Sequence, residues 1–233
     1  MRWFDRFSVL LLDMNGTFMF GHDRIGPSED YFATYQTLGG QRLERDRLQE
    51  IMHATCNALL RDYESPARFE DFPTLAQAFL EYGRASESDL PLLERVFAAH
   101  EIGCVPPEHS AFLARAATSH QLGIVSNICA RPEPWLKLFA QANQLSLFTS
   151  IVFSSEGRAI KPSRTLFTRA LADFPASSRV LFAGDSLERD IIPAKALGLA
   201  TVWIAAPGST HPDADRVITS LPDLATLVDS SAQ

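Results

Sequence analysis

Residues 8–17 read SVLLLDMNGT, an apolar run that ends at Asp13 and is followed closely by Asn15 and Gly16. The run is nearly continuous and does not alternate with polar residues, which is typical of a strand buried on both faces of a parallel sheet. Such a strand would place Asp13 at the carboxyl end of the sheet, where open α/β sheets bind their ligands. Taken alone, the Asn15–Gly16 pair is also a common hairpin sequence.

Similar apolar runs recur along the chain and alternate with helical patterns. Buried strands are predicted over residues 122–126, 151–154, 180–183 and 200–204; helices are predicted over 108–118, 132–142, 163–173 and 187–197, with a further helix start at 220–223. Strands that alternate with helices predict an α/β fold built on a doubly wound parallel sheet.

The region from about residue 27 to residue 100 contains no convincing strand. Its apolar residues follow helical spacing, and breaks fall at residues 39–40, 65–66, 83 and 106–107. We expect a helical insert of about four helices, entered after the first strand and left before the second.

Composition narrows the range of partners. The chain has 233 residues, of which 46% are hydrophobic and 21% charged, and its net charge is −7 without a basic run, which argues against a nucleic-acid partner. Its three cysteines share no metal-binding or disulfide spacing. No apolar run approaches the ~20 residues of a membrane span, and the N-terminal region lacks a signal-peptide pattern. The sequence therefore predicts a cytoplasmic protein without a membrane partner.

Polar residues capable of chemistry follow four of the predicted strands. Besides Asp13, these are Ser126 and Asn127 after the second strand, Lys161 after the third, and the segment GDSLERD over residues 184–190 after the fourth. One such residue alone would be an ordinary surface group or helix cap. Four groups in order at strand ends predict one shared ligand site.

These segments resemble the four motifs of the haloacid dehalogenase-like (HAD) superfamily of hydrolases, matched here by residues 13–17, Ser126, Lys161, and Asp185 with Asp190. The resemblance covers essentially the whole chain. It implies a Rossmann-like core over residues 1–20 and 105–233 and a small all-helical C1-type cap over 21–104. It also implies an Mg²⁺-dependent hydrolase, in first place a phosphatase, acting on a small phosphorylated molecule.

The resemblance implies a role for each matching residue. Asp13 is the expected nucleophile, which would form an aspartyl-phosphate. Asp13, Asp185 and the backbone carbonyl of Asn15 would hold Mg²⁺, and an all-oxygen shell suits that ion. Asp190 would orient a metal-bound water or Lys161, although it could also simply favour the N-terminal end of its helix.

The phosphoryl group would be held by several donors. Lys161 and Ser126 would balance the charge of the transferring group, which is most of what such catalysis requires. The backbone N–H of Gly16 and the hydroxyl of Thr17 would close the phosphate site. Asn127 offers a further amide donor to a phosphate oxygen.

Asn15 departs from the superfamily pattern. The phosphatases have an aspartate two residues after the nucleophile, which protonates the leaving oxygen, and an amide cannot transfer a proton in that way. Loss of a general acid/base typically costs about 10²- to 10⁴-fold in rate. Three outcomes follow: specialisation for acyl or aryl phosphates, whose leaving groups need no proton; a long-lived phosphoenzyme; or a catalytically silent protein that binds phosphate ligands.

The superfamily's 2-haloacid dehalogenases form a further alternative. They also lack the second aspartate, use an aspartate nucleophile on carbon and need no metal. We rank this alternative lower, because Asp185 and Asp190 retain the metal-binding pattern that such a reaction does not require.

Overall fold

The computed structural model describes residues 3–228. Its centre is a six-stranded parallel sheet in the order β3-β2-β1-β4-β5-β6. The strands are β1 (Val9–Leu12), β2 (Gln121–Ser126), β3 (Phe148–Phe153), β4 (Val180–Gly184), β5 (Ala200–Ile204) and β6 (Arg216–Ile218). The predicted doubly wound α/β fold is therefore confirmed. Because both described neighbours of β1 are parallel to it, the hairpin alternative at Asn15–Gly16 is wrong.

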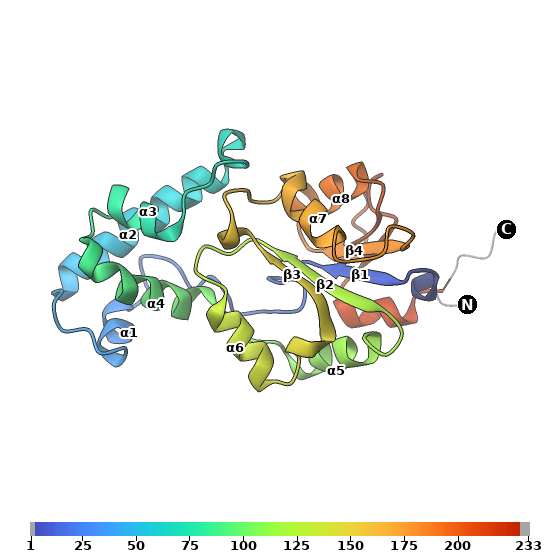
Figure 1. Ribbon diagram of the computed structural model, residues 1–233, viewed down its shortest axis with the longest axis horizontal. Coiled ribbons are helices and arrows are strands. Elements are labelled where there is room, and N and C mark those ends of the chain that lie inside the picture. Colours follow the sequence, from blue (N-terminus) through green and yellow to red (C-terminus); the bar gives the residue numbers. More distant parts are fainter. Residues whose placement is uncertain (1–2, 229–233) are drawn as a thin grey trace.

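Helices cover both faces of the sheet. Helices α5 (Pro107–Ala116) and α6 (Glu133–Gln141) lie on one face, and α7 (Arg164–Leu171) and α8 (Ile192–Ala196) lie on the other (Figure 1). Two buried clusters follow from this layering, because successive side chains of β1 point to opposite faces. Leu10 and Leu12 belong to one cluster, whereas Val9 and Leu11 belong to the other.

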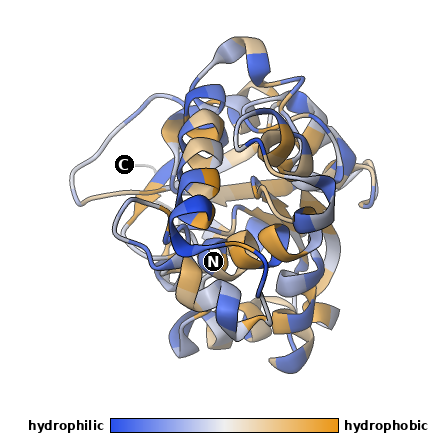
Figure 2. Cartoon of the chain, turned by 90° about the vertical axis from the view of Figure 1, so that its left-hand side faces the viewer, coloured by the Kyte–Doolittle hydropathy of each residue, from blue (hydrophilic) through white to orange (hydrophobic). Residues whose placement is uncertain are grey.

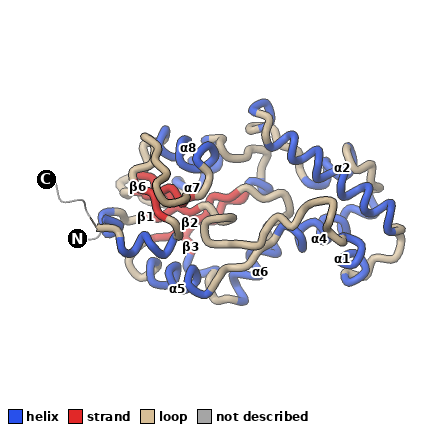
Figure 3. The backbone as a smooth tube through the Cα atoms, turned by 180° about the vertical axis from the view of Figure 1, so that it is seen from behind, coloured by secondary structure: helices blue, strands red, loops and turns tan. Residues whose placement is uncertain are grey.

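A group of helices lies beyond the end of the sheet. It comprises α1 (Tyr31–Thr37), α2 (Arg45–Tyr63), α3 (Leu75–Glu81) and α4 (Leu90–Glu101), which matches the expected helical insert (Figures 1 and 3). Seen from this end, the helices carry both hydrophobic and hydrophilic residues along their length, as expected when one face is buried (Figure 2). The two connecting segments pair where they pass each other, since Phe20 and Cys104 exchange two backbone hydrogen bonds of 2.9 Å. We propose residues 21–104 as the cap.

Short helical turns complete the fold: 3-10 turns η1 (Trp3–Arg6), η2 (Pro66–Arg68), η3 (Glu87–Asp89), η4 (Leu145–Leu147), η5 (Ser154–Glu156) and η7 (Leu221–Thr226), and the π-helical turn η6 (Leu187–Ile191). The helix predicted over 187–197 is therefore divided into η6 and α8. Pro193 has no N–H to donate to the carbonyl of Arg189, so a regular α-helix cannot run through this point. Among residues 3–228, no helix is both long and apolar enough to cross a membrane.

Candidate active site

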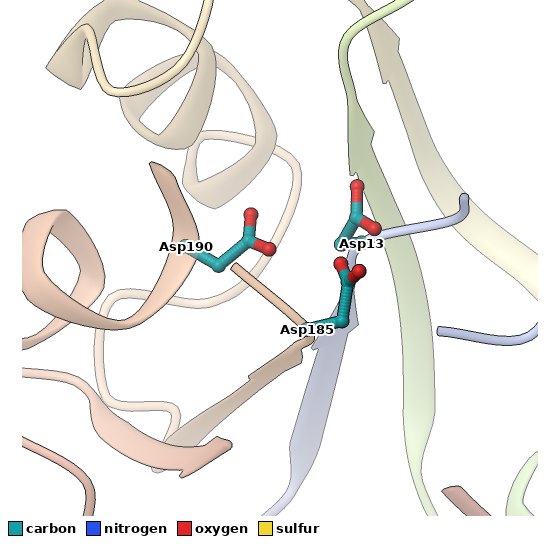
Figure 4. A group of neighbouring side chains, drawn as sticks. All are labelled: Asp13, Asp185 and Asp190. Atoms are coloured by element: carbon teal, nitrogen blue, oxygen red, sulfur yellow. The ribbon is translucent and has the colours of Figure 1, made fainter. Parts of the chain in front are cut away.

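The order of the strands places Asp13 and Asp185 close together. Strands β1 and β4 are neighbours at the point where the strand order reverses, and the backbone N–H of Asp13 donates to Ala183 at 3.0 Å. Asp185 follows the last residue of β4, and Asp190 reaches in from η6 (Figure 4). Asp13, Asp185 and Asp190 each contribute one carboxylate oxygen, and these oxygens lie within 4.8 Å of one another. This is the crevice in which open α/β sheets bind ligands.

Lys161 joins two of these carboxylates. Its Nζ donates to Asp13 Oδ1 at 2.6 Å and to Asp190 Oδ1 at 2.5 Å, and the residue is only 3% exposed. Burial by itself would lower the pKa of Lys161, but the charges of Asp13 and Asp190 outweigh it and hold the pKa above its ordinary value. The ammonium group therefore stays charged between the two acids.

Burial also sets the protonation of the other two acids. Asp185 is exposed as a residue, but neighbouring protein groups displace part of the water around its carboxylate; this desolvation raises the pKa of Asp185 to about 6, and the charge of Asp13 adds to this effect. Burial likewise raises the pKa of Asp190 to about 7, although Lys161 opposes the shift. Asp190 is fixed by its second oxygen, which accepts from the backbone N–H of Ser186 at 3.0 Å. The site thus brings together more negative charge than one lysine balances.

Two hydroxyl groups complete the surroundings of Asp13. Thr17 Oγ1 donates to Oδ2 of Asp13 at 3.2 Å, and Ser126 Oγ donates to Oδ1 at 3.3 Å. Gly16 has a φ of +77°, and a Cβ added there would lie 2.3 Å from Oδ2 of Asp185. The loop after β1 therefore needs glycine both for its backbone conformation and for the close approach of Asp185.

The donor set fits a hard divalent cation. All the candidate ligands are oxygens, which suits Mg²⁺, and a cation among them would offset the repulsion between the three carboxylates. In addition, Oδ1 of Asn15 is buried without a hydrogen-bond partner within the described residues. Such an orphaned acceptor is rare unless a ligand or ion completes the site.

Chain-distant contacts hold Lys161 in place, and sequence reasoning did not find them. The side chain of Asn127 accepts from the backbone N–H of Lys161 at 2.8 Å and donates to its carbonyl at 3.2 Å. Arg189 donates to the same carbonyl at 2.8 Å and to the carbonyl of Tyr63 at 2.6 Å, with its guanidinium 3.5 Å from the centre of the Tyr63 ring. The sequence offers one sign of these contacts, the basic residue Arg189 directly before Asp190.

Asn127 contacts the helical group as well as the backbone of Lys161. Its amide also donates to the hydroxyl of Tyr63 at 3.2 Å, so Asn127 and Arg189 both connect the end of α2 to the loop that carries Lys161. The predicted contact between Asn127 and phosphate stays a prediction. Its observed bonds position the backbone of Lys161.

Comparison with known proteins agrees with this geometry. The HAD-hydrolase-like family model (Hydrolase_like) matches residues 159–229, a span that contains Lys161, Asp185 and Asp190. The pyrimidine 5'-nucleotidase YjjG of Escherichia coli (strain K12) is 40% identical over 68 residues, which are 28% of this chain and 30% of that relative. Residues 159–229 therefore match the HAD-hydrolase-like family, and the chain spans about a third of the length of this curated relative.

Solved structures of the superfamily share the whole fold. A HAD phosphatase from Thermococcus onnurineus has a TM-score of 0.61 at 24% identity, with 94% of this chain and 96% of that chain covered. A 2-haloacid dehalogenase from Pseudomonas syringae pv. Tomato DC3000 has a TM-score of 0.62 at 19% identity, with 94% and 97% covered. At these identities the likeness shows the fold and does not separate the two reactions.

A cavity lies between the helical group and the core of the protein. Its volume is about 220 Å³, and it is lined from the helical side by α2 and α4 and from the core by residues 127–129, Ser154 and Ile160. Glu101, at the end of α4, faces it and accepts from the backbone N–H groups of Cys129 and Ala130 at 2.5 and 2.8 Å. Burial raises the pKa of Glu101 to about 8.

Two neighbouring residues in the segment that leads into the helical group, Asp23 and Arg24, make different contacts. Asp23 lines the cavity, whereas Arg24 donates to the carbonyls of Gly21, Ala99 and Ile102. Arg24 therefore holds the C-terminal end of α4 beside the connecting segment.

Proposed function

We propose that this chain is a metal-dependent phosphohydrolase that acts on a small phosphorylated molecule through an aspartyl-phosphate at Asp13. The observation that carries the proposal is the ammonium group of Lys161 between Asp13 and Asp190, with Asp185 beside them at the sheet's switch point. A carboxylate nucleophile, a fixed cation and further acidic ligands are the groups that phosphoryl transfer needs.

In the first step, a carboxylate oxygen of Asp13 would attack phosphorus. The new bond joins Asp13 to phosphorus, the bond between phosphorus and the leaving oxygen breaks, and its electron pair departs with that oxygen. Lys161 and the hydroxyl of Ser126, which contact Asp13 in the free protein, would balance charge on the phosphoryl oxygens. Thr17 would donate to the same group from the other side of Asp13.

In the second step, water would attack phosphorus, release Asp13 and give up a proton to solvent. Asp13, Asp185 and the backbone carbonyl of Asn15 would hold Mg²⁺, with Asp190 nearby. When bound, the cation would supply Lewis-acid stabilisation of the developing negative charge. Cytoplasmic location and the Mg²⁺ requirement belong to this proposal.

Asn15 would limit which leaving groups depart well. Its amide can donate a hydrogen bond to the leaving oxygen but cannot transfer a proton to it. Substrates whose leaving oxygen is stable as an anion would therefore react faster than alkyl phosphates, whose rate would fall by about 10²- to 10⁴-fold relative to an enzyme with the acid.

Two alternatives remain distinct in their predictions. A halide needs no proton on departure, so Asn15 is also compatible with a 2-haloacid dehalogenase; that reaction would turn over 2-chloropropionate with EDTA present. A catalytically silent phosphate-binding protein would turn over neither acetyl phosphate nor 2-chloropropionate, yet Mg²⁺ with inorganic phosphate would raise its thermal stability.

The test combines acetyl phosphate with intact mass measurement. Acetyl phosphate has a leaving group that needs no added proton, so steady phosphate release, abolished by EDTA and by Asp13→Asn, would support the proposal. A persistent phosphoryl adduct that Asp13→Asn removes would identify a stalled intermediate. Absence of both release and adduct, or EDTA-resistant dehalogenation, would overturn it.

A further inference from the structure

We propose that the cavity between the helical group and the core receives an apolar aromatic ring, so that the substrate is an aryl phosphate, the phosphate monoester of a phenol. The inference rests on the proposed function, because it assigns the group that would leave when Asp13 takes the phosphoryl group. Independent observations at the cavity and at Asn15 lead to it.

The position of the cavity suits a group attached to phosphorus at Asp13. Asn127 lines the cavity and directly follows Ser126, whose hydroxyl lies 3.3 Å from Asp13. Ile160 also lines it and directly precedes Lys161. The two core segments that bring donors to Asp13 therefore continue into the cavity wall.

The size of the cavity suits a substituted ring. An engineered apolar cavity of about 150 Å³ is enough to bind benzene. The cavity here measures about 220 Å³, which leaves room for an aromatic ring with a small substituent.

The lining of the cavity suits an uncharged, apolar group. Most of the lining side chains are aliphatic, aromatic or thiol groups, contributed chiefly by α2, α4 and residues 128 and 160. None of the described residues that line it is Lys, Arg or His, so a second anionic group on the substrate would find no cationic partner. Two acidic side chains, Asp23 and Glu101, also line the cavity, and Glu101 already accepts hydrogen bonds from two backbone N–H groups.

Asn15 favours the same class of substrate, because an aryl oxygen can leave without first receiving a proton. As Asp13 bonds to phosphorus, the bond to the aryl oxygen breaks and its electron pair leaves as phenolate, which later takes a proton from solvent. A phenol has a pKa near 10, whereas water, a guide to alkyl alcohols, has a pKa near 15.7. A phenolate therefore departs readily without the acid that Asn15 cannot supply, whereas an alkoxide departs much more slowly.

Two phosphate esters that carry the same aromatic ring test whether the leaving group decides the rate. Phenyl phosphate releases a phenolate and benzyl phosphate an alkoxide, so kcat/KM is expected to favour phenyl phosphate by about 10²-fold or more. Asn15→Asp is expected to narrow that ratio by about 10²-fold. Equal rates on the two esters, or an unchanged ratio in Asn15→Asp, would overturn the inference.

A matched pair of variants tests the cavity. Leu60 lines the cavity and is 59% exposed, so Leu60→Trp adds volume at its rim without burying a new side chain. Leu80 is 37% exposed in the same helical group but does not line the cavity. We expect Leu60→Trp to raise KM for phenyl phosphate about tenfold relative to KM for acetyl phosphate, and Leu80→Trp to leave the ratio unchanged.

The proposed phosphohydrolase activity and the assignment of an aryl phosphate as its substrate can fail independently of each other. If acetyl phosphate turns over but uridine monophosphate outperforms phenyl phosphate, or Leu60→Trp changes both KM values equally, the phosphohydrolase stands and the aryl assignment falls. If no probe releases phosphate, both fall.

Discussion

Gly16 offers the sharpest test of the acidic site, because glycine is needed there for two separable reasons. Its φ of +77° is costly for any residue with a side chain, by about 1–2 kcal/mol. A Cβ at this position would also lie 2.3 Å from Oδ2 and 2.7 Å from Cγ of Asp185. Gly16→Ala should therefore strain the backbone and displace a proposed metal ligand.

The two effects differ in what they cost. To reach an ordinary contact of 3.4 Å, the carboxylate of Asp185 must move by about 1 Å, since 3.4 − 2.3 = 1.1 Å. Asp185 is exposed, so this movement should cost little stability. Metal ligands, however, tolerate only about 0.2 Å, and a misplacement of about 1 Å can cost roughly 10²-fold in rate.

Gly21 provides the matched control. Its φ is +66°, and a Cβ there would meet nothing within 4 Å. Gly21→Ala thus reproduces the backbone strain without the contact to Asp185. Both variants should lower the melting temperature by roughly 2–8 °C, the range that about 1–2 kcal/mol implies for a chain of this size.

The assay is thermal unfolding with and without Mg²⁺, combined with phosphate release from acetyl phosphate. Gly16→Ala should lose most of the Mg²⁺-dependent rise in melting temperature and about 10²-fold in rate, whereas Gly21→Ala should keep both. A response to Mg²⁺ that survives in Gly16→Ala, or an equal loss of activity in Gly21→Ala, would contradict the proposed metal site beside Gly16.

Further predictions concern the contacts around the site. Arg189→Met removes two charged hydrogen bonds, to Lys161 and Tyr63, from a side chain only 12% exposed, and should cost about 2–4 kcal/mol in urea unfolding. Arg169→Met, whose ion pair spans 3.9 Å at 42% exposure, should cost under ~0.5 kcal/mol; equal losses would contradict the special role of Arg189. Glu101 keeps its proton to about pH 8 in the fold but releases it near 4.5 when unfolded, so its contribution makes stability fall as pH rises through this window. Glu101→Gln should flatten that slope in urea unfolding at pH 5, 7 and 9. Finally, EDTA should abolish phosphate release, and added Mg²⁺ should restore it.

Local sequence patterns were sufficient for most of the core. The continuous apolar runs predicted five of the strands, because a strand buried on both faces must be apolar throughout. Strand β6 lacks such a run, since Arg216–Ile218 is only three residues long, begins with a charged residue and is only partly buried. The helix over 187–197 was predicted as one piece, because periodicity does not register the bond that Pro193 cannot donate.

The sequence by itself determined which groups arrive at the strand ends: Asp13, Lys161, Asp185 and Asp190, together with the amide of Asn15 in place of an acid. These follow from local order along the chain, where a strand and the residue after it are neighbours by covalent connection. Only the tertiary structure decided the strand order, the salt bridges of Lys161 and the cavity. The contact between Arg189 and Tyr63 joins residues 126 positions apart, and no local pattern specifies such a pair. It exists because the helical group packs against the core and brings the end of α2 to η6, and that packing depends on the whole chain.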